Sequence, residues 1–300
     1  MKTFILENDS IKAVCIAYGA ILHQLWVKDI HGVPTNVIMG LATPEEYLTD
    51  KWARGAVIGR FAGRLVNPIQ VGGQSVTIEN ENGVMLHSGK SGWHLKNWTP
   101  KYTREQNTIT FEYDCPEGSS GFPGSVHAHV TYTLKTNGLE IQYQAKPSAT
   151  TPINMTNHAY FSMNPNTPIG KQKLFIHADH YLELQNLVPT GRKLDVGLTP
   201  LDFRNEKNID NTPLDDYFVI KKRNHFISSI YSPDTGIQMK VYTDQPGVVV
   251  FTPPHFDAIC FETQKFSNSP NIPDFPSTLV EANQEYNHSS FFEFSLRIEG

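Results

Sequence analysis

Apolar and polar residues alternate along much of the chain, with the period of two that half-buried β-strands show. The clearest stretch lies between residues 126 and 145, where apolar positions from Val126 to Leu134 and from Leu139 to Ala145 alternate with polar ones. Asn137-Gly138 separates the two runs and is typical of a tight turn with positive φ angles. The segment is therefore predicted to be a β-hairpin.

Weaker alternation predicts three more strands, at Thr108–Asp114, Ile237–Thr243 and Phe292–Ile298. Val248–Phe251 is continuously apolar, which predicts a strand buried on both faces. The pattern breaks down at 114–125, 162–172, 185–217 and 264–289, so these stretches are predicted to be loops, of a length that binding loops often have.

A single segment carries a convincing helix start. Thr43-Pro44-Glu45-Glu46 offers a capping residue, a proline at the first helical position and a glutamate placed for a capping box. The helix is predicted to be short, because Gly55 ends the pattern.

The composition agrees with a β-rich protein: aromatic residues make up 11% of the 300 residues, and 21 glycines and 20 prolines are spread along the whole length. There is no composition break, no low-complexity linker and no repeat of fixed period. We therefore expect one large antiparallel β domain over residues 1–300, with few helices.

The charge balance limits the possible partners. The sequence has 25 Lys and Arg against 30 Asp and Glu, a formal net charge of −5, which argues against nucleic acid or an anionic membrane as a partner. No apolar run approaches the ~20 residues that cross a bilayer, and no signal peptide follows Met1.

The three cysteines are widely separated, so disulfides are not expected and a cytoplasmic location is predicted. No sequence feature specifies an oligomeric state.

Gly89-Lys90-Ser91 resembles the end of a phosphate-binding loop, but that motif needs a glycine five residues before Gly89, where Val84 stands. The sequence contains neither a G-x-G-x-x-G nor a G-x-S-x-G motif. Evidence for a dinucleotide fold or an α/β-hydrolase nucleophile is therefore lacking.

Two pairs of histidines have spacings that could bind a metal. His127 and His129 lie two apart on one strand face, and His177 and His180 flank Asp179. The sequence offers no third ligand at a convincing spacing for either pair. We therefore interpret both pairs as polar surface and predict no metal.

Ionisable residues gather in four separated segments, Gly59–Arg64, Met85–Lys90, Pro152–Phe161 and Ile259–Gln264. In the last two, His158 and Glu262 interrupt otherwise apolar strand sequence. A buried histidine is usually a satisfied core residue, and a strand glutamate usually points to solvent. Together, on opposite sides of one pocket, the two would form an acid–base pair.

Five segments between about residue 36 and residue 286 carry the motifs that identify a family. They are Gly59–Leu65, Leu86–Gly92 with Trp98, Asn154–Phe161, Thr199–Arg204, and Glu262-Thr263-Gln264 with Ser269-Pro270-Asn271 and Phe275-Pro276-Ser277. In this order they resemble G-R-x-x-N-R-I, L-H-G-G-x-x-G, N-L-T-N-H-S-Y-F, G-T-P-x-D-F-R and E-T-Q…P-N…F-P-S-T of the aldose 1-epimerase, or galactose mutarotase, family.

The resemblance implies a large antiparallel β-sandwich with an open sugar-binding cleft and no cofactor. By the same resemblance, Glu262 would be the general base and His158 the general acid. The sugar hydroxyls would be held by Arg64, His87 and Asp215, with Tyr160 a further addition and Asp216 a competitor for the place of Asp215. The substrate would be a small-molecule sugar.

Two positions depart from the family pattern. Gly63 stands where many members have Asn, and Val249 stands where Gln is expected. Each removes a hydrogen bond to substrate, which leaves the preferred sugar open more than the chemistry.

The implied reaction is the interconversion of the α and β anomers of a free hexose such as galactose or glucose, through ring opening and reclosure. Opening removes the proton of the anomeric hydroxyl and delivers one to the ring oxygen. A carboxylate and a protonated imidazole can do both. Since the ordinary pKa of Glu is ~4.3 and that of His ~6.5, the cleft is expected to keep Glu262 ionised and His158 protonated near neutrality.

Three alternatives remain. A hexose 6-phosphate mutarotase would need a basic pocket, for which Arg54, Arg60 and Lys90 are candidates. A glycosidase would pair Glu262 with Asp215 as its two carboxylates. A non-catalytic sugar-binding module could use the same scaffold.

Overall fold

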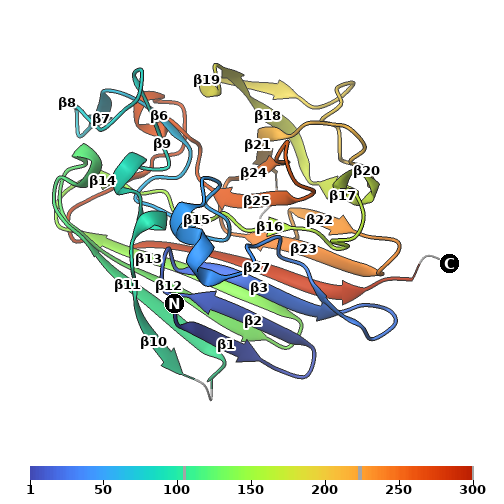
Figure 1. Cartoon of the computed structure of the whole chain (residues 1–300). Coiled ribbons are helices and arrows are strands. Elements are labelled where there is room, and N and C mark those ends of the chain that lie inside the picture. Colours follow the sequence, from blue (N-terminus) through green and yellow to red (C-terminus); the bar gives the residue numbers. More distant parts are fainter. Residues whose placement is uncertain (104–105, 222–224, 299–300) are drawn as a thin grey trace.

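The computed structural model describes residues 1–103, 106–221 and 225–298. Within these ranges the strands form three main antiparallel sheets (Figure 1). The large sheet contains, in spatial order, β10 (Thr99–Thr103), β11 (Thr108–Cys115), β12 (Val126–Lys135), β13 (Gly138–Pro147), β27 (Tyr286–Leu296), β23 (Ile237–Thr243), β22 (Ser228–Tyr231), β17 (Lys173–Ile176) and β20 (Lys207–Asn208).

A second sheet, here called the cleft sheet, has the order β16 (Tyr160–Phe161), β25 (Ile259–Gln264), β24 (Gly247–Phe251), β21 (Asp215–Ile220), β18 (Ala178–Gln185) and β19 (Val188–Asp195). The third is formed by β1 (Thr3–Glu7), β2 (Ile11–Ile16), β3 (Ile21–Lys28) and β4 (Pro34–Asn36). Two-stranded pairs complete the strands: β5 (Val57–Ile58) with β15 (Thr156–Asn157), β6 (Arg64–Val66) with β9 (Val84–Leu86), β7 (Ile69–Val71) with β8 (Gln74–Val76), and β14 (Thr151–Pro152) with β26 (Leu279–Val280).

The core lies where these sheets meet. One continuous cluster of buried apolar side chains includes Leu25 of β3, Tyr132 of β12, Val250 of β24 and Phe292 of β27. In Figure 1 the cleft sheet lies above the large sheet, and β1–β3 lie along the lower edge of the molecule. The buried side chains that alternate along the strands of the three sheets thus pack into one shared core. The strands pair antiparallel, so the predicted antiparallel all-β fold is confirmed.

The predicted hairpin at 126–145 is confirmed, but its turn differs from the prediction. Lys135 pairs with Gly138, so the two loop residues are Thr136 and Asn137, and neither Asn137 nor Gly138 has a positive φ. Gly138 serves close packing instead. A Cβ there would lie 2.3 Å from the carbonyl oxygen of Phe292 on the neighbouring β27.

The other predicted strands are present with shifted limits. β11 and β23 match closely, whereas β27 begins at Tyr286, within a stretch predicted to be a loop. Val248 and Val250 of β24 are buried in the core, but Val249 and Phe251 are half-buried. The prediction that this strand is buried on both faces is therefore wrong.

The stretch 185–217 is also not a loop throughout, because it contains β19. The strand was missed because it contains Pro189 and Gly191, and both residue types are rare in strand interiors. β19 is the edge of the cleft sheet, where a proline without an N–H costs no sheet hydrogen bond, and a bulge in its pairing with β18 accommodates the irregularity.

Helical structure among the described residues is limited to short 3₁₀ segments: η1 (Pro44–Thr49), η2 (Gly89–Ser91), η3 (Trp93–Leu95), η5 (Ser119–Gly121), η6 (Ile169–Lys171) and η7 (Ser269–Asn271). The predicted helix start exists at η1, with Pro44 in the first turn. The predicted capping box does not form: Thr43 makes no side-chain cap, and Glu46 accepts from the N–H of Ala42. In the described part of the chain, none of these helices has the length and apolarity to span a bilayer.

Candidate active site

All six residues predicted for the site line one cleft of about 1370 Å³. Tyr160 lies on β16, Glu262 on β25 and Asp215 on β21, so three of them come from the cleft sheet, and His158 lies in the short link between β15 and β16. Arg64 begins β6, and His87 directly follows β9. The cleft thus lies between the cleft sheet and the β6–β9 region, and it brings together residues about 200 positions apart in sequence.

Glu262 is held rigidly within the sheet. Every residue of β25 is buried, and Glu262 lies opposite Val249 in the register with β24. Its Oε2 atom is buried and has no hydrogen-bond partner among the described residues. A buried carboxylate oxygen without a partner is costly, which points to an oxygen reserved for a ligand.

His158 is fixed through both its backbone and its ring. Its N–H donates to the carbonyl of Ala56, and its own carbonyl accepts from Gly55. The imidazole stacks on the ring of Tyr160, with centroids 5.0 Å apart, and its Nδ1 lies 3.6 Å from the Sγ of Cys260. The remaining nitrogen, Nε2, is thereby turned toward the cleft.

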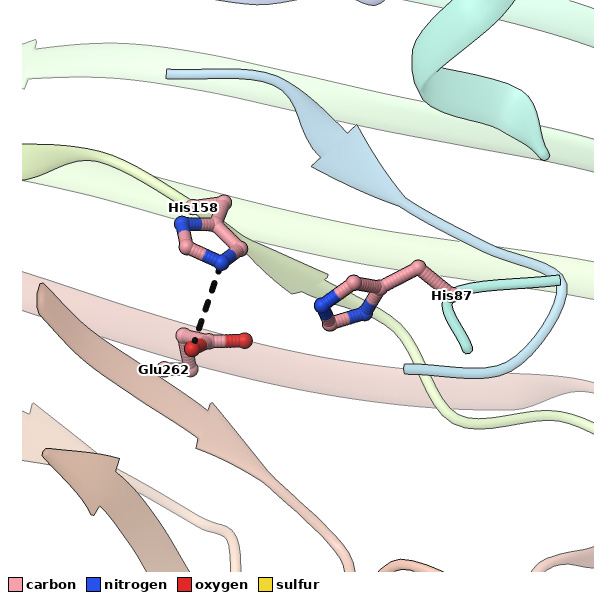
Figure 2. A group of neighbouring side chains, drawn as sticks. All are labelled: His87, His158 and Glu262. Carbon is pink, nitrogen blue, oxygen red and sulfur yellow. Dashed lines mark ion pairs between the residues drawn. The ribbon is translucent and has the colours of Figure 1, made fainter. Parts of the chain in front are cut away.

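His158 and Glu262 lie side by side, not on opposite sides of the pocket as the sequence suggested (Figure 2). The distance from Nε2 of His158 to Oε1 of Glu262 is 3.5 Å, too short for a sugar ring to fit between the two groups. The arrangement still suits an anomeric centre. The hydroxyl oxygen O1 and the ring oxygen O5 are both bonded to C1, so two adjacent groups can reach one each.

Burial sets the protonation of this pair, in the opposite sense to the expectation from the sequence. It lowers the pKa of His158 to about 4 and, together with the charge of Asp215, raises the pKa of Glu262 to about 8. At neutral pH the pair therefore holds one proton, on the carboxyl group. An ion pair of carboxylate and imidazolium holds the same single proton, so one transfer interconverts the two forms.

His87 faces the same space, with its ring 5.4 Å from that of His158 (Figure 2). Its Nδ1 accepts a hydrogen bond of 3.2 Å from the N–H of Gly63, so Nε2 carries the ring hydrogen. Burial and neighbouring His158 hold its pKa well below the ordinary value. His87 is thus a neutral hydrogen-bond donor toward the cleft.

The ligand atoms of His87, His158 and Glu262 lie within 4.8 Å of one another, a spacing that could also surround a metal ion. A metal needs a nitrogen lone pair, and the contact with Gly63 already occupies the one on Nδ1 of His87. The donor set therefore suits the oxygen of a sugar hydroxyl better than a cation.

The structure distinguishes the two neighbouring aspartates. Asp215 lines the cleft, and burial raises its pKa against the opposing charge of Arg64. Successive strand residues point to opposite faces, and Asp216 pairs in register with Val250, a core residue. Its Oδ2 accepts from the N–H of Asp215. Asp216 thus supports the backbone while Asp215 faces the cleft.

Aromatic rings form a wall that the sequence analysis did not find. Trp52 and Phe251 line the cleft with their rings stacked at 6.3 Å, and the Tyr160 hydroxyl donates to the carbonyl of Trp52. Such rings offer an apolar face to the C–H groups of a sugar. Phe251 could not be recognised as a cleft residue from sequence, because an aromatic residue in an apolar strand has the same pattern whether it lines a cleft or lies in the core.

The two departures from the family pattern have structural counterparts. Gly63 has a φ of +84°, and a Cβ on it would lie 2.0 Å from Oγ of Ser267, so Ser267 fills the space of a side chain at position 63. Val249 lines the cleft beside Glu262 and adds apolar surface there. Ser267 and Gln264 also line the cleft, and Gln264 was visible in the Glu262-Thr263-Gln264 motif.

The chain is similar to known proteins over nearly its whole length. The family described as aldose 1-epimerase matches residues 2–293. The chain is 34% identical to galactose mutarotase of Mus musculus and 32% identical to that of Homo sapiens, in each case over 99% of this chain and 94% of the relative. Aldose 1-epimerase of Escherichia coli (strain K12) is 28% identical over 96% of this chain and 93% of its own.

Solved structures show the same fold. An aldose epimerase homologue from C. elegans superimposes with a TM-score of 0.94 at 24% identity and covers 99% of both chains. A galactose 1-epimerase from Lactobacillus acidophilus has a TM-score of 0.87 at 23% identity, over 98% of this chain and 94% of its own.

Proposed function

The chain belongs to the aldose 1-epimerase family, and we propose that it converts the anomers of free galactose or glucose with Glu262 and His158 as its acid–base pair. It is an isomerase of the mutarotase type. What supports the proposed residue roles is one observation: a buried carboxyl and a buried imidazole, 3.5 Å apart, face a cleft wide enough for a hexose.

In the reacting form Glu262 is a carboxylate and His158 an imidazolium. Glu262 removes the proton from the anomeric hydroxyl as Nε2 of His158 delivers one to the ring oxygen, and the C1–O5 bond breaks to give the open-chain aldehyde. Rotation about C1–C2 exposes the other carbonyl face. On reclosure His158 takes the proton back from the attacking hydroxyl and Glu262 returns one to O1, so no proton is gained or lost.

The residues around the pair are proposed to orient the sugar. Nε2–H of His87 and the guanidinium of Arg64 donate to hydroxyl oxygens, whereas Asp215 accepts from a hydroxyl group. Donors and acceptors thus approach from two sides of the cleft, while Trp52 and Phe251 pack against the ring. The hydroxyl hydrogen of Tyr160 is directed to the Trp52 carbonyl, so Tyr160 contributes through its ring stacked on His158.

Polarimetry on freshly dissolved α-galactose and α-glucose tests this proposal. Glu262→Gln and His158→Asn are each expected to lower kcat by roughly 10²- to 10⁴-fold, with folding and weak sugar binding retained. Asp216→Asn is the matched control, because it changes a neighbouring carboxyl that faces away from the cleft. Wild-type turnover by purified Glu262→Gln would refute its role as the base.

A hexose 6-phosphate substrate receives little support from the basic residues proposed for it. Arg60 is buried and donates to the carbonyls of Pro123 and Gly124, and Arg54 packs on the ring of Phe256. Lys90 does line the cleft, but its backbone N–H donates to Glu79, and Glu79 and Glu81 bring negative charge to the same cleft. We therefore expect slower turnover of glucose 6-phosphate than of glucose, and the reverse ranking would overturn this expectation.

The compartment and the domain organisation are part of the same proposal. Cys15, Cys115 and Cys260 are all buried and free, which suits a reducing compartment such as the cytoplasm. A single domain over residues 1–300 is supported by the large sheet, whose strands extend from Thr99 to Leu296, and by the shared core.

A further inference from the structure

The outer face of β11 and β12 carries a second cluster of histidines and carboxylates. In the register of this pair Glu112 lies opposite His129, and Asp114 lies opposite His127. The alternate residues of β12, such as Ala128 and Val130, are buried in the core. All four polar side chains therefore lie on the face turned away from the core. The sequence offered no third ligand for the two histidines, and the pairing of the strands supplies one.

The distances suit metal coordination. One ring nitrogen of each histidine and one oxygen of Glu112 lie within 4.8 Å of one another. Nδ1 of His129 is 3.3 Å from Oε1 of Glu112, and two ligand atoms bonded at 2.0–2.1 Å to a tetrahedral Zn²⁺ are about 3.3 Å apart. Little movement is thus needed to close around an ion.

Asp114 completes the arrangement. Its Oδ1 lies 2.5 Å from Nδ1 of His127, and an N–H donated to this carboxylate leaves a lone pair on Nε2. Histidines that bind metals commonly donate their other N–H to a carboxylate, which fixes the orientation of the ring.

We propose that Glu112, His127 and His129 bind a divalent transition-metal ion, Zn²⁺, on the outer face of the large sheet, with Asp114 orienting His127. Imidazole and carboxylate ligands favour Zn²⁺ over Mg²⁺ or Ca²⁺, which prefer oxygen ligands alone. Three protein ligands leave the remaining position open to water or to a group from another molecule.

One cation competes for this site. Nζ of Lys101 on β10 lies 2.6 Å from Oε1 of Glu112, the oxygen that would bind the metal. Lys101 is exposed, so its ammonium can move into solvent when an ion binds. Removal of this ammonium should therefore strengthen metal binding, whereas an ordinary surface ion pair would give no such effect.

The test is titration of the intact protein, without a histidine tag, with Zn²⁺ at pH 7.5 by isothermal calorimetry. We expect one Zn²⁺ per chain, affinity at least tenfold weaker in His129→Gln and in Glu112→Gln, and tighter binding in Lys101→Met. His180→Gln is the matched control, since His180 is an exposed strand histidine whose partner in the sequence motif, Asp179, is already paired with Lys221 and Arg204.

His158→Asn distinguishes this site from the His87, His158 and Glu262 cluster in the cleft. Zn²⁺ binding that persists in His158→Asn and weakens in His129→Gln supports the outer site. Binding lost in His158→Asn, or unchanged in His129→Gln, overturns it, and unchanged affinity in Glu112→Gln excludes Glu112 as a ligand. The mutarotation rate of His129→Gln should equal that of wild type, so the result does not depend on the proposed function.

Discussion

Among the described residues, two buried histidines, His158 and His288, each lie beside a carboxylate, and only the pair at His158 faces the cleft. His158 and Glu262 are 3.5 Å apart, and Oε2 of Glu262 has no partner among the described residues. His288 and Asp244 are 2.8 Å apart; the imidazole is buried, whereas about half of the Asp244 side chain is exposed to solvent. Both imidazoles stack on a tyrosine, Tyr160 for His158 and Tyr143 for His288.

The two pairs differ in how many hydrogen-bond partners the protein provides for their polar atoms. Nδ1 of His288 faces Asp244, and its Nε2 lies 3.1 Å from the carbonyl of Thr263. Asp244 also accepts from the side chain of Gln245 and from the N–H of Ser289. Although burial opposes its ionisation, these hydrogen bonds lower the pKa of Asp244, whereas that of Glu262 is raised to about 8. The hydrogen bonds of His288 and Asp244 are made within the protein, whereas Oε2 of Glu262 has no partner among the described residues, and this difference is why we propose that only the His158–Glu262 pair acts on a ligand.

The largest expected effect is on turnover. The two carboxyl-to-amide variants should differ in kcat per folded molecule. Glu262→Gln should lose roughly 10²- to 10⁴-fold in kcat, whereas Asp244→Asn should keep the wild-type value. The measurement is polarimetry, with the folded fraction taken from circular dichroism. An equal loss of kcat in both variants would show that the distinction between the pairs is wrong.

The same two variants should change stability in opposite directions. The native state holds a proton on Glu262 that the unfolded state releases above its ordinary pKa of 4.5, so the contribution of Glu262 to the free energy of unfolding falls as pH rises from about 4.5 to about 8. At pH 7 this cost is on the order of 3 kcal/mol, and Glu262→Gln removes it.

Glu262→Gln should therefore unfold at a higher temperature than wild type at pH 7 to 8, with the gain vanishing near pH 4.5. Asp244→Asn should lose about 1–3 kcal/mol at pH 7, because it weakens hydrogen bonds to His288 and Ser289. Thermal unfolding across this pH range measures both changes, and destabilisation by Glu262→Gln at pH 8 would contradict the raised pKa.

The pH dependence of kcat/KM should follow the cleft pair alone. Catalysis needs one proton on the pair, which gains a second below about pH 4, the pKa of His158, and loses its last above about pH 8, the pKa of Glu262. We expect a bell-shaped profile with limbs near these values, unchanged in Asp244→Asn. A profile that falls off near pH 6.5 would mean that burial leaves His158 unperturbed.

The proposed acid–base pair was picked out from sequence because His158 and Glu262 interrupt apolar sequence typical of buried strands, where an ionisable residue is costly. His288 interrupts an apolar pattern as well, yet it lies in the stretch 264–289 that was predicted to be a loop, so its burial was not visible. Sequence alone shows neither the contacts that satisfy His288 nor their absence around Glu262, since both depend on residues distant in the chain.

The fold class was predictable because alternation is local, whereas the faces of particular strands were not. Val249 and Val250 look alike in sequence, but one lines the cleft and the other is buried in the core. The pairing of Glu112 with His129 likewise depends on strand register. Likewise, the sequence does not show that Ser267 occupies the space that a side chain at position 63 would need, because the two residues are about 200 positions apart in the chain.

The smallest expected effect concerns the far side of the His158 ring, where the two pairs also differ. Nδ1 of His288 faces a carboxylate, whereas Nδ1 of His158 faces the weakly polar Sγ of Cys260 at 3.6 Å. Cys260→Ser places a stronger hydrogen-bonding group there, which should favour the imidazolium and move the acid limb of the kcat/KM profile upward by a fraction of a pH unit. Cys260→Ala removes the contact and should move it the other way. Because both residues are small, a merely structural role for Cys260 would change stability in both variants and leave the acid limb in place.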